Sequence, residues 1–135
     1  MNLEEALRIM KDRGFKYTGK REEMIRICAA EKRYLSAKEI MEQMKENYPN
    51  LSFDTVYRNL STFVELGILE ETELEGEGKF RLACSHGHHH HLICTSCGKT
   101  TELEACPMRE VGDLPSDFQV TGHKFEIYGK CNTCG

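Results

Sequence analysis

The first half of the chain has the hydrophobic pattern of helices. In four stretches, apolar residues recur every three or four positions, which places them on one face of a helix. Asn2, Thr18 and Ser36 precede three of these stretches, and their side chains can accept hydrogen bonds from the first free backbone amides. We therefore expect helices that begin near residue 3, after residue 18 and near residue 37, the third ending by residue 47, and a fourth helix within residues 52–67.

A hairpin pattern follows the fourth helix. Gly67 can provide the left-handed residue that ends this helix. The segments ILEETEL and KFRLAC then have the composition of two strands, joined by a glycine-bearing turn over residues 75–78. Several helices followed by a hairpin is the element order of a winged helix-turn-helix domain.

The pattern changes again beyond Cys84. Short strands are expected over residues 88–94, 100–104 and 119–128, with a short helix over 107–113 whose first turn contains a proline. We expect these elements to form a small domain with a three-stranded sheet, separated from the helical part where the pattern changes. We expect an α+β protein with two domains, residues 1–83 and 84–135.

The composition indicates a folded protein and a reducing environment. Hydrophobic residues make up 39% of the chain and charged residues 30%. No apolar run approaches the length of a membrane span, and the amino-terminal segment lacks the apolar core of a signal peptide. We expect a cytoplasmic protein that does not bind membranes. In the cytoplasm, seven cysteines favour metal ligation over disulfide bonds.

Two Cys-x-x-Cys pairs indicate a structural zinc site. Cys94 and Cys97 form one pair, and Cys131 and Cys134 form the other. Four thiolates close the tetrahedral coordination of a structural zinc ion. A redox-active dithiol is the alternative for one such pair, but two pairs in one cytoplasmic chain favour zinc.

The tract HGHHHHLIC contributes further metal ligands. Side chains alternate between the two faces of a strand, so His88 and His90 share one face, and His89 and His91 share the other. One tract can therefore contribute to two sites, and a flexible polyhistidine tract is the alternative. Further ligand residues lie outside the tract: Cys84 at the end of the preceding strand, Glu102 across a short turn, and His123 farther along the chain.

Two features favour nucleic-acid binding despite a net charge of −4. Residues 11–21 contain five lysines and arginines and a single aspartate. The fourth helix has a polar face that can contact phosphates and base edges, although a packed helix with a solvated side would look the same. That face consists of Thr55, Arg58, Asn59 and Thr62.

The segments SFDTVYRNLSTFVELGIL and HHHHLICTSCGKTTEL resemble the ferric uptake regulator family of bacterial metal-dependent repressors. The similarity covers residues 3–134. It implies a winged-helix DNA-binding domain, an α/β dimerisation domain, and a homodimer that binds an inverted-repeat operator in double-stranded DNA. Within the family, the chain is most similar to zinc uptake regulators of Gram-positive bacteria. Cys84 stands five residues before His89, as in zinc sensors, and Tyr34 stands where iron and peroxide sensors have a histidine.

The resemblance also implies roles for single residues. A regulatory zinc would be bound by Cys84, His89 and His91 with either Glu70 or Glu102. A third metal would be bound by His88, His90, His123 and an acidic residue of the short helix, where Arg109 aligns and Glu110 is adjacent. On the DNA side, the resemblance nominates Tyr57 and Arg58 for the recognition helix and Lys16, Tyr17 and Arg21 for the backbone or minor groove, and Lys20 lies in the same basic segment.

The expected function is repression of zinc uptake genes when zinc is bound, with one structural and at least one regulatory zinc ion per subunit. Regulators of the same family that respond to iron, nickel or peroxide are the alternatives, followed by a passive zinc-binding protein. A metalloenzyme is not favoured, because neither a His-Glu-x-x-His motif nor a nucleophile elbow is present.

Overall fold

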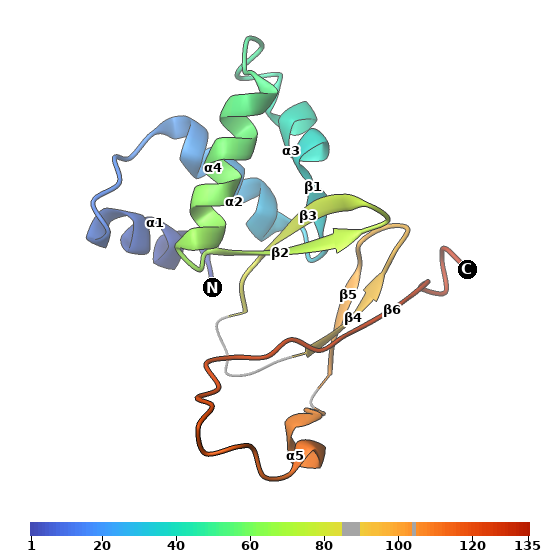
Figure 1. Ribbon diagram of the computed structural model, residues 1–135. Helices are drawn as coiled ribbons and strands as arrows, with labels where there is room; N and C mark the ends of the chain where they lie inside the picture. Colours follow the sequence, from blue (N-terminus) through green and yellow to red (C-terminus); the bar gives the residue numbers. More distant parts are fainter. Residues whose placement is uncertain (85–89, 104) are drawn as a thin grey trace. The chain divides into compact units, whose positions relative to one another are not determined.

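The computed structural model describes residues 1–84, 90–103 and 105–135. The chain divides into two compact units, Met1–Ser85 and His86–Gly135. The division lies two residues from the boundary expected from the sequence. Both units combine helix and strand, so the protein has a mixed α+β fold (Figure 1).

Four helices form most of the first unit, and each begins where a polar side chain caps it. Asn2, Thr18 and Ser52 each accept a hydrogen bond from a backbone amide of the following turn. Ser36 and Glu39 form the reciprocal capping box. The helices are α1 (Leu3–Asp12), α2 (Gly19–Ala30), α3 (Ala37–Met44) and α4 (Phe53–Glu65).

A three-stranded antiparallel sheet completes the first unit. Strands β2 (Leu69–Leu74) and β3 (Glu77–Leu82) form the expected hairpin, and β1 (Leu35–Ser36), which the sequence pattern did not predict, pairs with β3. The turn is shorter than expected. Glu75 and Gly76 both have positive φ, 53° and 80°, as a two-residue turn that matches the strand twist requires.

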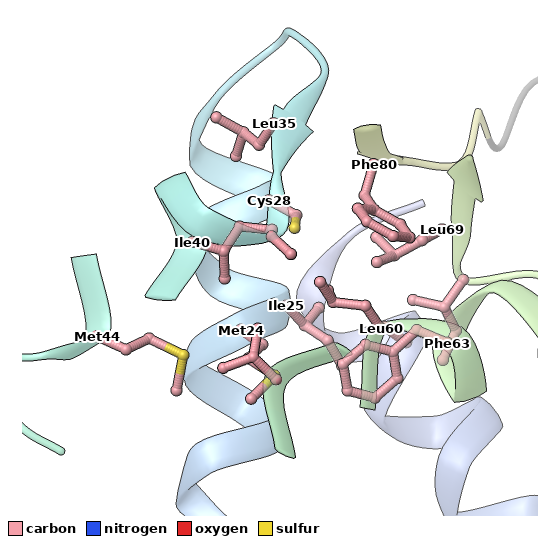
Figure 2. Packing of buried hydrophobic residues seen from close by; sticks show 14 of the residues in the cluster. Met24, Ile25, Cys28, Leu35, Ile40, Met44, Leu60, Phe63, Leu69 and Phe80 are labelled. Carbon is pink, nitrogen blue, oxygen red and sulfur yellow. The ribbon is translucent and has the colours of Figure 1, made fainter. Parts of the chain in front are cut away.

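The core of the first unit joins all of these elements. Figure 2 shows side chains of α2, α3, α4 and the sheet meeting in one apolar cluster. From α4, Val56, Leu60 and Phe63 are fully buried, whereas residues on the other side of the helix, such as Tyr57 and Arg58, are exposed. The apolar stripe therefore fixes which face of α4 remains on the surface.

The second unit contains a sheet with the order β5-β4-β6. Strand β4 (His90–Cys94) pairs antiparallel with β5 (Thr100–Leu103) and parallel with β6 (Glu126–Gly129). The helix α5 (Met108–Val111) begins after Pro107, as expected. The expected strand over 119–128 is wrong over most of its length, because only its last residues and Gly129 pair with β4. Within the described residues, no helix is long and apolar enough to cross a membrane.

Replacing Phe63 with alanine should destabilise the first unit by about 3–5 kcal/mol, the usual cost of removing a fully buried phenylalanine. Phe53 on the same helix is 51% exposed and gives a matched control. Denaturant unfolding followed by helical circular dichroism measures both. Equal losses for Phe63→Ala and Phe53→Ala would contradict this core.

Candidate metal centres and nucleic-acid surface

The parallel pairing of β4 and β6 brings the two Cys-x-x-Cys pairs together. Cys94 is the last residue of β4 and pairs with Gly129, the last residue of β6. Because parallel strands end at the same edge of a sheet, the turn after β4 and the segment after β6 leave it side by side. Cys97 lies in the first of these segments, and Cys131 and Cys134 lie in the second.

The four sulfur atoms have the spacing of a tetrahedral metal site. All four lie within 4.8 Å of one another, and the Sγ atoms of Cys97 and Cys131 are 3.8 Å apart. A zinc ion with bonds of about 2.3 Å to each sulfur would separate them by roughly 3.8 Å. None of the four cysteines is in a disulfide bond. The residues present therefore fit a structural zinc ion.

Hydrogen bonds shift the pKa values of three of the four thiols, and not all in the same direction. Backbone amides of Cys131 and Cys97 lower the pKa of Cys94 to about 6. Hydrogen bonding with the Thr133 side chain lowers the pKa of Cys131. By contrast, hydrogen bonds with the sulfurs of Cys131 and Cys97 raise the pKa of Cys134 to about 12. Anionic sulfurs at this density need a cation, and a metal ion would remove the remaining protons.

A second group of ligands in the same unit includes a residue that sequence reasoning missed. His90, Cys106 and His123 each offer a ligand atom within 4.8 Å of the others. The sequence predicted His90 and His123 for a common site but not Cys106. Glu110, the acidic residue considered for this site, is exposed on α5 and is not part of the group. His88 lies outside the described residues.

The ligands expected for the regulatory metal are distributed over both units. His91 and Glu102 are direct cross-strand partners in β4 and β5, which places their side chains on one face. Cys84 lies near the end of the first unit, and the Arg81 side chain donates a hydrogen bond to its sulfur at 3.2 Å. Arg81 also forms an ion pair of 3.2 Å with Glu70. His89 lies outside the described residues.

The polar residues expected on α4 lie on one face of the helix, and most of their side chains form hydrogen bonds or ion pairs within the protein. Arg58 forms an ion pair of 2.5 Å with Asp54, one turn earlier, and both side chains are more than three-quarters exposed. The side chain of Asn59 donates to the carbonyl of Thr55, and that of Thr62 donates to the carbonyl of Arg58. The face therefore presents Arg58 as an exposed cation.

Arg21 connects the basic segment to this face. Its Nε donates to the side chain of Asn59 at 3.1 Å, and its Nη1 donates to the carbonyl of Lys16 at 2.6 Å. The Nζ atom of Lys20 lies over the Tyr48 ring, 5.8 Å from the ring centroid. The amino-terminal end of α2 is thereby fixed against α4, with two lysine side chains on the surface beside it.

Aromatic residues extend the exposed surface of α4. Tyr57, which the sequence nominated, is 43% exposed and stacks on Phe53 with ring centroids 6.1 Å apart. Tyr57 also contacts Phe80 of β3 edge to face. Tyr17 is 62% exposed, and its hydroxyl donates to Glu22, a hydrogen bond that raises the pKa of Tyr17. Phe53 was not nominated, although its exposure at the first turn of α4 follows from the helical period.

Comparison with known proteins assigns the chain to one family. Residues 12–128 match the ferric uptake regulator family. A ferric uptake regulation protein of Staphylococcus epidermidis is 49% identical over 134 residues, covering 99% of this chain and 97% of that protein. The crystal structure of the Vibrio cholerae ferric uptake regulator is 30% identical with a TM-score of 0.70, covering 90% of this chain and 96% of the other.

A zinc uptake regulator complexed with zinc and DNA shares the fold, with a TM-score of 0.71 over 97% of this chain and 91% of the other. At 22% identity this likeness concerns the fold alone. The family match covers most of the chain, and a relative with nearly half its residues identical spans almost all of it. The chain therefore belongs to the ferric uptake regulator family, whose members are metal-responsive transcriptional regulators and not enzymes.

Proposed function

We propose that this protein is a zinc-responsive transcriptional repressor that binds an inverted-repeat operator as a homodimer and controls genes for zinc uptake. The single observation that carries metal dependence is the group of four thiols, whose spacing fits a structural zinc ion; zinc as the sensed ion is proposed from the Cys84 thiolate. The protein would act in the cytoplasm, where bacterial DNA is located.

The choice of zinc rests on ligand chemistry. Relatives at about half identity are named for ferric uptake regulation, and those names describe those proteins. In this chain, Cys84 supplies a thiolate to the regulatory ligand set that the resemblance implies. Thiolate and imidazole together suit zinc, whereas oxygen-rich sites suit harder ions. Iron, nickel or peroxide sensing is the second candidate, supported by the names of the relatives.

The first unit is proposed to bind DNA as a winged helix, with α4 in the major groove and the β2–β3 hairpin as the wing. Support comes from the exposed Arg58 and Tyr57 on α4 and from the basic amino-terminal end of α2 fixed beside them. Lysine and arginine contacts to phosphates provide most of the affinity, and side chains at the start of a recognition helix contact bases. The second unit is proposed to form the dimer.

The regulatory zinc is proposed to bind Cys84, His89 and His91 with Glu102. Glu102 is chosen over Glu70 because strand pairing puts it directly opposite His91, whereas the Glu70 carboxylate pairs with Arg81. Zinc at this site would favour the arrangement of the two units in which both α4 helices of the dimer fit successive half-sites. By linkage, zinc and DNA must then tighten each other's binding by the same factor.

Cys84→Ser should keep the zinc ion of the four-cysteine group and the dimer but lose the zinc dependence of operator binding, because only the regulatory ligand set is changed. Fluorescence anisotropy of operator DNA, titrated against buffered free zinc, measures this. Cys28→Ala is the matched control, since this thiol is buried in the core with its pKa raised to about 12 by burial. A Cys84→Ser protein that still responds to zinc would contradict the proposed site.

Zinc binding to the four-cysteine group should release protons, and more of them at pH 5 than at pH 7.5. Cys134, with its pKa raised to about 12, must lose a proton at either pH. Cys94, with its pKa lowered to about 6, is mostly a thiolate at pH 7.5 and mostly protonated at pH 5, where it contributes an additional proton. Zinc affinity should therefore fall as the pH falls.

Calorimetry of the first zinc equivalent in buffers of different ionisation enthalpy counts the released protons. Cys131→Ser should abolish this tight equivalent, and Cys28→Ala should preserve it. Proton release that does not change between the two pH values would contradict these thiol states.

Lys20→Gln and Arg58→Ala should weaken DNA binding in different ways. Loss of a phosphate contact at Lys20 should reduce affinity for all sequences and lower the salt dependence by about one charge. Loss of a base contact at Arg58 should cost about 1–3 kcal/mol on the operator and much less on unrelated DNA. Binding of each variant to operator and to unrelated DNA, measured at several salt concentrations, distinguishes the two effects. The same loss of affinity and the same salt dependence in both variants would contradict the assignment.

A further inference from the structure

Three segments that are distant in the sequence meet at His90. The side chain of His90 belongs to β4 and is 4% exposed. Its Nε2 is 3.3 Å from the Nε2 of His123, in the segment before β6. The same His123 nitrogen is 3.3 Å from the sulfur of Cys106, just before α5. The ring of Phe125 packs edge to face against His90 and covers part of the group.

These distances match the edges of a metal coordination tetrahedron. With zinc bonds of about 2.0–2.1 Å to nitrogen and 2.3 Å to sulfur, two ligand nitrogens are roughly 3.3 Å apart and a nitrogen and a sulfur roughly 3.6 Å apart. Ring nitrogens and a sulfur converge on one point, and each can offer a lone pair in its metal-binding form. This convergence of lone pairs favours a cation among them.

We infer that Cys106 is a metal ligand and that, with His90 and His123, it forms a thiolate-containing zinc site separate from the four-cysteine group. The family resemblance implies an acidic residue of the short helix at this place, and no carboxylate is part of the group among the described residues. A thiolate in its place changes the preferred ion from a hard cation to zinc or another borderline-soft ion.

The site would order a long irregular part of the second unit. Between the end of α5 at Val111 and the start of β6 at Glu126, the described residues form neither helix nor strand. Several apolar side chains there are exposed, among them Phe118 at 68% and Val120 at 40%. A metal bound by Cys106, just before α5, and by His123, near the end of this stretch, would hold both residues to His90 of β4, so metal binding and local folding would be coupled.

Cobalt binding to proteins that lack Cys84 tests the assignment without DNA, and so independently of the proposed function. In Cys84→Ser protein that keeps its four-cysteine zinc, added Co²⁺ should produce a thiolate-to-cobalt charge-transfer band. Cys84→Ser/Cys106→Ser should lose that band and one equivalent of bound metal, whereas Cys84→Ser/Cys28→Ala should keep both. A band that survives Cys106→Ser, or one that never forms, would overturn the inference.

A second measurement uses the unmodified chain, in case the double variant fails to fold. Zinc added to the protein should protect Cys106 from alkylation by iodoacetamide, located by peptide mass mapping, and should slow amide exchange across residues 112–125. His123→Ala should abolish both effects. Alkylation of Cys106 at the same rate with and without zinc would also overturn the inference.

Discussion

The parallel pairing of β4 with β6 is the constraint on which the metal chemistry of the second unit depends. Parallel strands end at one edge of their sheet, and here that edge carries a Cys-x-x-Cys pair on each outgoing segment. Without the pairing, the two pairs would be separated by more than thirty residues of chain. A zinc ion at this edge would in turn hold β6, a strand of only four residues, against β4. Sheet and metal site therefore depend on each other.

The first unit is organised by a different principle, in which packing decides what remains exposed. The buried face of α4 fixes the helix against the core, so that Arg58 and Tyr57 are on the surface. The hydrogen bond between Arg21 and Asn59 then joins the basic segment to the same surface. A surface arranged before binding loses less conformational freedom when DNA is bound. The ion pair of Arg58 with Asp54 is exposed and can be exchanged for a contact with DNA at small cost.

Much of this arrangement could be read from the sequence, because the relevant signals are local. Helix period, capping residues and the glycine turn predicted α1 to α4 and the hairpin, and paired cysteines predicted the four-thiol group. Strand β1 was missed because two residues carry no alternating pattern. The strand over 119–128 was predicted too long, because its apolar residues suggest a buried strand but only its end finds a pairing partner in β4.

Cys106 was missed for a related reason, since its partners His90 and His123 are brought to it by tertiary structure and not by spacing. The odd number of cysteines was the only hint.

Coupling between zinc and DNA is the central claim, and zinc affinity measured with and without operator DNA tests it most directly. The account predicts that operator DNA tightens the binding of the labile zinc by the same factor by which zinc tightens DNA binding, typically about 5 to 150-fold. Equal zinc affinities in the presence and absence of the operator would contradict it.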